Sequence, residues 1–261
     1  MPWAHGPVSI LMPVCNEADV IEDVLDEWIH EVLDKLPPGS EMVLDDCSND
    51  GTEKILADIA RRHPQVRVEF NPRDGFFNSA MRLYRLAKCP LVFFTDSDGQ
   101  YVPAEFWKVA ESIDANDMVH GAKIARKDPL YRVAASAAYN GLVRLMFRSK
   151  CEDVNSAFRL IRRPLLDAVL GQVHCLRMLP NSEMYIRAEA MGFRIRNVPV
   201  SHRARKFGKS RSLPWRRFVM ECFRAFRGIL ELRRELSSLK RTRGPAEAAG
   251  NIGLRGDARR P

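Results

Sequence analysis

The sequence has no uninterrupted apolar run near the roughly 20 residues that a helix needs to cross a bilayer. Its first residues carry no basic segment followed by a long apolar one, so we expect no secretory signal. The six cysteines include no Cys-x-x-Cys pair, which favours free thiols over disulfides or a zinc site. We therefore expect a cytoplasmic chain, with any membrane contact made peripherally.

Acidic residues are scarce in the last quarter of the chain, and basic residues are concentrated there. Residues 1–199 hold 24 Lys and Arg against 28 Asp and Glu, a net charge of −4. Residues 200–261 hold 17 against 5, a net charge of +12. This asymmetry indicates that the C-terminal side faces an anionic surface or an anionic acceptor.

Short apolar runs alternate with longer segments of helical period, which is the pattern of a mostly parallel, Rossmann-like α/β sheet flanked by helices. The predicted strands are 8–12, 42–44, 66–70 and 91–95, and the predicted helices are 19–36, 50–62 and 78–87. In such sheets ligands bind beyond the carboxyl ends of the strands, so the loops there should carry the site. We expect a catalytic domain over 1–212, a basic amphipathic helix over 213–240 and a disordered tail over 241–261.

Two carboxylates, Asp96 and Asp98, directly follow the predicted strand 91–95. A nucleoside diphosphate-sugar needs a hard divalent cation to neutralise its leaving group, and Mg²⁺ and Mn²⁺ take oxygen ligands. Gln100 could supply a further oxygen. Asp-x-Asp also occurs in ordinary turns, but its position after an apolar strand favours a metal-diphosphate site.

Polar residues also follow the first two strands: Asn16 and Glu17 after one, Asp45 and Asp46 after the other. Helix capping and turn formation would account for neighbours such as Asp50 and Gly51. Capping and turn formation do not explain why two acidic residues, Asp45 and Asp46, stand together at this strand end. A carboxylate in such a position can accept hydrogen bonds from a base or a ribose.

A short basic segment, 202–211, holds Arg203, Arg205, Lys209 and Arg211, with Gly208 giving backbone freedom. Guanidinium groups match phosphate oxygens in a bidentate manner, so the segment is typical of a phosphate site. The alternative is a solvated basic loop.

Five segments in this order, 13–17, 44–52, 96–98, 153–160 and 202–211, resemble the family 2 glycosyltransferases, which have the GT-A fold. The last two narrow the resemblance to polyprenyl-phosphate sugar transferases, the dolichol-phosphate mannosyltransferase group. The similarity spans residues 7 to 215. Three departures concern donor and phosphate recognition: Cys15 stands where close relatives usually have Tyr, Arg211 where they usually have Lys, and 73–78 lacks their Lys-Gly pattern.

The resemblance implies a role for each matching residue. Asp96 and Asp98 would hold Mg²⁺ or Mn²⁺ with Gln100 as an auxiliary ligand, and Arg205 and Arg211 would bind the acceptor phosphate. Asp153 would lie on the acceptor side, with a structural salt bridge as an equal alternative. The residues implied to line the nucleotide pocket are Pro13, Cys15, Glu17, Leu44, Asp46 and Asp96.

The expected reaction is inverting transfer of a sugar from a UDP- or GDP-linked donor to a polyprenyl phosphate. A family 2 enzyme with a saccharide or other soluble acceptor is the main alternative, and a nucleotidyltransferase would need a Gly-rich phosphate loop that is missing after 8–12. An inactive scaffold whose basic arm binds nucleic acid or a membrane partner is an alternative of another class. We expect no nucleic-acid partner, because the loop carboxylates are all present.

Residues 213–236 have apolar residues at helical spacing, which predicts an amphipathic helix on an anionic membrane surface. The alternatives are that its apolar stripe packs on the protein's own core, on a second subunit or on a partner membrane protein. The stripe consists of Trp215, Phe218, Val219, Cys222, Phe223, Phe226, Ile229 and Leu230.

Overall fold

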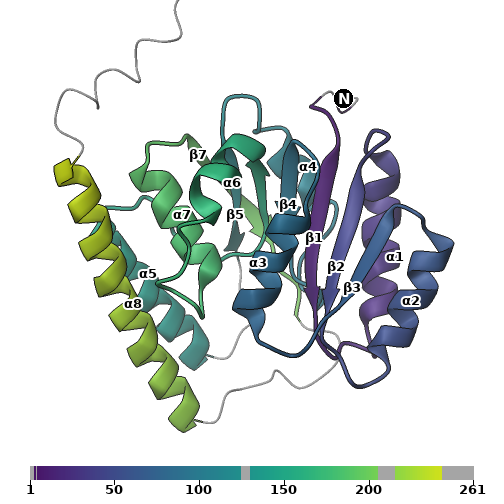
Figure 1. The fold of residues 1–261 in the computed structure, drawn as a ribbon, viewed down its shortest axis with the longest axis horizontal. Coiled ribbons are helices and arrows are strands. Elements are labelled where there is room, and N and C mark those ends of the chain that lie inside the picture. The colour runs from purple at the N-terminus through teal and green to yellow at the C-terminus, as the bar shows by residue number, and fades with distance from the viewer. Residues whose placement is uncertain (1–2, 4, 125–129, 205–214, 243–261) are drawn as a thin grey trace, which may run out of the picture.

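A seven-stranded sheet forms the core of the protein, and helices flank both of its faces (Figure 1). The computed structural model describes residues 3, 5–124, 130–204 and 215–242. The strand order is β3-β2-β1-β4-β6-β5-β7. The predicted α/β class with a mostly parallel sheet is confirmed.

The first four strands pair in parallel, so their carboxyl ends meet at one edge of the sheet. They are β1 (Val8–Val14), β2 (Glu41–Asp46), β3 (Val66–Phe70) and β4 (Leu91–Phe94). All four predicted strands are present. β1 and β2 run two residues further than predicted, because pairing continues to the register pair Val14↔Asp46. Asp45 and Asp46 are therefore the last residues of a strand and not loop residues.

The second half of the sheet contains one reversed strand. β6 (Arg159–Arg162) runs antiparallel to both β4 and β5 (Met118–Ile124), and β5 is parallel to β7 (Ile195–Ser201). The two reversals cancel, so β5 and β7 end at the same edge as β1 to β4. Ligand-binding loops from both halves of the sheet can therefore meet there.

Glycines and chain geometry set where the first helices begin. α2 (Thr52–Arg62) begins two residues later than predicted because Gly51 has a left-handed φ of 100°. α3 (Phe76–Leu86) follows Gly75, which also has a φ of 100°. The predicted helix 19–36 is shorter, α1 (Ile21–Glu31), followed by a 3₁₀ turn (Leu33–Lys35), since Val32 leaves the helical region with a φ of −128°. The remaining helices of the body are α4 (Glu105–Ala110), α5 (Leu130–Phe147), α6 (Arg163–Leu170) and α7 (Pro180–Ala190).

The predicted C-terminal helix is present as α8 (Trp215–Thr242), which runs beside the body in Figure 1. Its predicted single apolar stripe is divided. Ile229 is fully buried against the body together with Leu232, whereas Phe223 and Phe226 are 62% and 44% exposed. The helix also extends past residue 240, so the predicted tail boundary is two residues too early. The rest of that tail lies outside the described residues.

A close backbone approach and an ion-pair network attach α8 to the body. A Cβ built on Gly228 would lie 2.4 Å from the Cys175 carbonyl oxygen, which only glycine allows. Arg187 of α7 is buried and donates to Glu183 and to Glu235 of α8, at 2.8 and 2.7 Å from its Nη2. This half of α8 is therefore a packed part of the protein.

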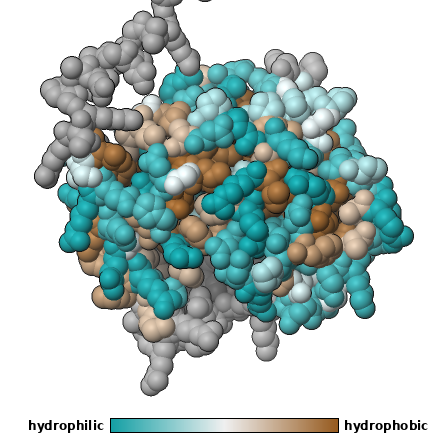
Figure 2. All heavy atoms as spheres, viewed as in Figure 1, coloured by the Kyte–Doolittle hydropathy of each residue, from teal (hydrophilic) through white to brown (hydrophobic). Residues whose placement is uncertain are grey.

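Hydrophilic side chains predominate on the face shown in Figure 2, where the hydrophobic ones form small separate patches. Among the described residues, no helix combines the length and apolar character that a bilayer crossing requires. The buried apolar residues instead form one continuous core around the sheet.

Candidate active site

The loops after β1 and β2 are joined by hydrogen bonds at the carboxyl edge of the sheet. The Asn16 amide nitrogen donates to Ser48 Oγ at 2.6 Å, and the Glu17 amide nitrogen donates to Thr52 Oγ1 at 3.0 Å. Asn16 has a φ of 54°, in the left-handed region that Asn tolerates better than most residues. These contacts bring the first two predicted motifs into one fixed unit.

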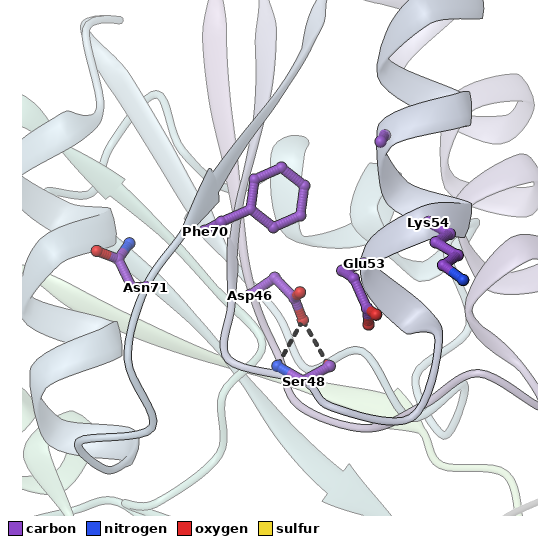
Figure 3. A pocket seen from close by; sticks show the side chains of 7 residues that line it. Asp46, Ser48, Glu53, Lys54, Phe70 and Asn71 are labelled. Atoms are coloured by element: carbon purple, nitrogen blue, oxygen red, sulfur yellow. Dashed lines mark hydrogen bonds between the residues drawn. The ribbon is translucent and has the colours of Figure 1, made fainter.

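Asp46 lines a cavity of about 540 Å³ between the ends of β2 and β3 and the start of α2. Figure 3 shows its carboxylate and the Phe70 ring pointing toward Glu53 and Lys54 of α2. Asp46 Oδ1 accepts hydrogen bonds from the Ser48 amide and hydroxyl at 3.2 and 2.5 Å. Burial raises the pKa of Asp46 despite these bonds, so a ligand that donates hydrogen bonds to the carboxylate would offset part of its desolvation.

Phe70 is a site candidate that sequence reasoning missed. It ends β3, is 54% exposed and stands beside Asp46 in the same cavity. An exposed flat ring next to a carboxylate suits a nucleoside, with the base on the ring and polar groups on the acid. The available sequence signal was a large aromatic at the carboxyl end of a strand.

Asp45, predicted together with Asp46 as a ligand contact, has a structural role instead. Successive strand residues face opposite sides, so Asp45 is fully buried on the α3 side. Arg82 Nε and Nη2 both donate to it at 2.9 Å, and Asn71 Nδ2 donates at 2.7 Å. The Arg82 pair neutralises this carboxylate, which corrects the prediction.

Asp96 and Asp98 lie in the loop that follows β4, and both are partly exposed. Gly99 has a φ of 71°, and the Gln100 amide nitrogen donates to Asp98 Oδ1 at 3.1 Å, which fixes this tight turn. The turn presents two hard oxygen donors at the carboxyl edge of the sheet. This donor chemistry fits Mg²⁺ or Mn²⁺.

Arg203 connects the end of β7 to the Asp96–Asp98 loop. Its amide nitrogen donates to the Gln100 carbonyl oxygen at 2.7 Å, and Gln100 Nε2 donates back to the Arg203 carbonyl oxygen at 3.2 Å. Its guanidinium forms a bidentate ion pair with Glu27 of α1, at 2.9 and 2.8 Å. Arg203 therefore has a structural role, because it attaches the end of β7 to the Asp96–Asp98 loop and to α1. This corrects the prediction that it is one of the phosphate-binding cations. Arg205 and Arg211 lie outside the described residues.

The negative charges of Asp96 and Asp153 both influence the buried hydroxyl group of Tyr101. Burial raises the pKa of Tyr101, the positive charge of Lys123 opposes this, and the negative charges of Asp96 and Asp153 add to it. The Tyr101 hydroxyl is 3.0 Å from Ser156 Oγ. The fold therefore brings the 153–160 motif close to the Asp96–Asp98 loop.

The side chain of Asp153 is buried and lies 3.8 Å from Lys123 Nζ, so the salt-bridge alternative has a partner in the structure. Both residues line a second cavity of about 520 Å³, which Lys150 and Glu152 also line. The acceptor-side role of Asp153 stays a prediction.

The remaining predicted nucleotide contacts are spread over β1 and β2. Pro13, Cys15 and Glu17 are partly exposed at the carboxyl end of β1. Leu44 is fully buried in the core, so its side chain presents no surface to a ligand in this structure. The nucleotide role of the other three stays a prediction.

Solved structures with a similar fold include sugar transferases. Glucosyl-3-phosphoglycerate synthase from Mycobacterium tuberculosis, in complex with Mn²⁺, UDP and glucosyl-3-phosphoglycerate, superposes with a TM-score of 0.64 at 19% identity, over 87% of this chain and 80% of that chain. A mannosyltransferase from Pyrobaculum calidifontis in complex with GDP-Man and Mn²⁺ gives 0.55 at 19% identity, over 96% and 79%. These matches show that the fold is GT-A-like.

Curated relatives are more similar in sequence. An undecaprenyl-phosphate 4-deoxy-4-formamido-L-arabinose transferase of Edwardsiella ictaluri is 30% identical over 208 residues, 78% of this chain and 62% of that protein. Glycosyltransferase AglD of Haloferax volcanii is 27% identical over 203 residues, 74% of this chain and 32% of that protein. The chain thus spans less than two thirds of the length of either relative.

A model of the family described as glycosyl transferase family 2 matches residues 9–170, from β1 to the end of α6. The matched region contains the cavity at Asp46, the Asp96–Asp98 loop and Asp153. Because this match covers more than half of the sequence, the chain belongs to glycosyltransferase family 2.

Proposed function

We propose that this protein transfers a sugar, with inversion, from a nucleotide-sugar to the phosphate of a polyprenyl phosphate. The observation that carries the proposal is the pair of hydrogen bonds between Gln100 and Arg203. They join the Asp96–Asp98 loop to the chain two residues before Arg205, where the basic segment continues. The name of the Edwardsiella relative, an undecaprenyl-phosphate sugar transferase, supports the same acceptor class.

The donor nucleoside is proposed to occupy the cavity beside Asp46 and Phe70, with its diphosphate directed past the end of β1 toward Asp96 and Asp98. β1 lies between β2 and β4 in the sheet, so these two places flank it. A divalent cation held by Asp96 and Asp98 would neutralise the charge of the nucleoside diphosphate leaving group.

The acceptor needs little activation, because a phosphate monoester is already ionised at neutral pH. The protein's contribution is then to position the phosphate oxygen opposite the leaving group and to balance its charge. Arg205 and Arg211 are proposed for this task. Arginine suits it because its planar guanidinium binds phosphate through two parallel hydrogen bonds.

The test is transfer of labelled sugar from a panel of UDP- and GDP-sugars to a short polyprenyl phosphate, with Mn²⁺, Mg²⁺ or EDTA. The expected result is a labelled lipid product with one donor and loss of product in EDTA. Comparison of polyprenyl phosphate with the matching polyprenol isolates the contribution of the phosphate. Equal transfer to both would contradict the role of the basic segment.

A soluble phosphorylated acceptor is the second candidate. The name of the Mycobacterium tuberculosis neighbour, glucosyl-3-phosphoglycerate synthase, supports this candidate. The same assay with 3-phosphoglycerate in place of the lipid separates the two candidates. Turnover with the soluble acceptor alone would replace the polyprenyl-phosphate proposal.

We also propose that the exposed half of α8 rests on an anionic membrane surface, where it would meet a lipid acceptor. Phe223 and Phe226 are exposed, and Arg224 and Arg227 lie on the same two turns. Flotation with anionic liposomes tests this with the double variant Phe223→Ser, Phe226→Ser. Leu239→Ser is the matched control, since Leu239 is a similarly exposed residue on the other half of α8. Flotation that is equal in both variants would oppose the proposal.

A further inference from the structure

Cys15 and Cys47 are neighbours at the carboxyl edge of the sheet. The β1–β2 register ends with Val14 opposite Asp46, and each cysteine is the next residue on its strand. The Cys47 amide nitrogen still donates to the Val14 carbonyl oxygen at 3.1 Å, so the two chains remain side by side beyond the strands. The Cys15 thiol donates to the Cys47 carbonyl oxygen, with Sγ and O 3.6 Å apart.

The backbone is held on both sides of this pair. The β1–β2 ladder precedes it, and the hydrogen bond from the Asn16 amide to Ser48 Oγ follows it at 2.6 Å. Adjacent strands lie about 4.8 Å apart, and a disulfide needs Cα atoms about 4.4–6.8 Å apart. A bond between the two sulfurs would therefore need side-chain rotation and little backbone movement.

The two thiols also interact with each other. Burial raises the pKa of Cys47 to about 12, and a hydrogen bond with the Cys15 thiol adds to the shift. Both side chains are partly exposed, so a small reagent can reach them. The other four cysteines lie on separate elements: Cys89 before β4, Cys151 before β6, Cys175 before α7 and Cys222 on α8.

We infer that Cys15 and Cys47 form a dithiol site that small-molecule disulfides oxidise to a cystine, and that nucleotide bound at this edge protects the site. The Cys15 thiolate attacks one sulfur of oxidised glutathione and releases one glutathione. Cys47 then loses its proton and attacks the Cys15 sulfur of the mixed disulfide, which releases the second glutathione. The two protein thiols lose two electrons, the oxidant gains them, and the two protons go to the released thiolates.

Cys47 is the second thiol to react because its raised pKa makes it the poorer first nucleophile. The loop closed by this disulfide contains α1, the 3₁₀ turn and all of β2. Constraining a loop of this length in the unfolded chain raises the unfolding temperature, by roughly 5–10 °C.

The experiment treats the fully reduced protein with oxidised glutathione and maps its peptides without reduction. The expected result is a linked Cys15–Cys47 peptide in the wild type and in the control Cys89→Ser. In Cys47→Ser the reaction should stop at a glutathione adduct on Cys15. A lasting adduct on wild-type Cys15 without the linked peptide would overturn the dithiol, as would a cross-link to Cys222 in its place.

A thermal shift first shows that the nucleotide binds. Protection is then measured by comparing the rate of Cys15–Cys47 oxidation with and without UDP and Mn²⁺. This half of the inference rests on the proposed function, and it predicts a slower reaction in the nucleotide-saturated protein. An unchanged rate at saturation would overturn protection. Absence of any thermal shift with nucleoside diphosphates would instead count against the proposed function, while the linked peptide alone decides the dithiol.

Discussion

Gly228→Ala should destabilise the protein although alanine favours helices. In an exposed helix, the exchange stabilises by about 0.5–1 kcal/mol. Here the added Cβ would lie 2.4 Å from the Cys175 carbonyl oxygen and 2.8 Å from Leu176 Cδ2. The nearest atom belongs to the backbone, so α8 or the 175–176 segment has to move, at a cost of about 1–3 kcal/mol for overpacking. The net expectation is a loss of about 0.5–2 kcal/mol.

The matched control is Gly141→Ala on α5, where a new Cβ meets nothing within 4 Å. It should gain about 0.5–1 kcal/mol from helix propensity alone. The assay is thermal unfolding followed by circular dichroism, in which each kcal/mol corresponds to roughly 2–4 °C for a protein of this size. The two variants should shift in opposite directions. An equal rise in unfolding temperature for both variants would show that α8 does not pack against the Cys175 carbonyl in solution. It would also contradict the conclusion that one half of the apolar stripe is buried against the body.

Three further predictions concern the site and its support. Asp98→Asn should lower metal-dependent transfer by roughly 100-fold or more, through loss of one charged oxygen ligand, with an unchanged circular dichroism spectrum; activity within a few-fold of wild type would remove Asp98 from the site. Arg205→Ala and Arg211→Ala should each raise the KM for polyprenyl phosphate roughly 10-fold or more and leave UDP affinity unchanged, so an effect on UDP alone would contradict their acceptor role. Burial lowers the pKa of His120 to about 3 in the folded protein, whereas a His in the unfolded chain has a pKa of about 6.5. Between these two pH values the unfolded chain binds one more proton than the folded protein. The free energy of unfolding therefore falls as the pH drops from about 6.5 towards 3. Urea unfolding at pH 7 and pH 5 should show a smaller loss for His120→Gln than for wild type, and equal losses would refute the assignment.

Three strands of the first half, β1, β2 and β4, were predictable because parallel strands buried on both faces are short apolar runs separated by helical segments. The same rule placed Asp96 at a strand end. The edge strand β3 was predictable from its alternation of apolar and charged residues. Glycines then determined helix starts within two residues, through positive φ at Gly51 and Gly75. The antiparallel β6 was not predicted, because strand direction depends on which distant segment a strand pairs with.

Asp45 and Asp46 show that sequence also cannot predict which partner a polar residue of the site meets. Period-two alternation places Asp45 and Asp46 on opposite faces of β2. The partner that neutralises Asp45, Arg82, lies 37 residues away and is supplied by α3. From the sequence, Arg203 is likewise predicted to be one of several phosphate-binding cations. In the structure, α1 lies beside the end of β7, and Arg203 is paired with Glu27.

The sequence by itself determined the alternation of strands and helices, the pair of oxygen donors at Asp96 and Asp98, and the amphipathic character of α8, because these depend on residue type and local spacing. The tertiary structure decided which carboxylates and cations are already paired and which half of α8 is covered, and it set Phe70 beside Asp46. Those outcomes depend on contacts between segments far apart in the chain, which local spacing does not encode.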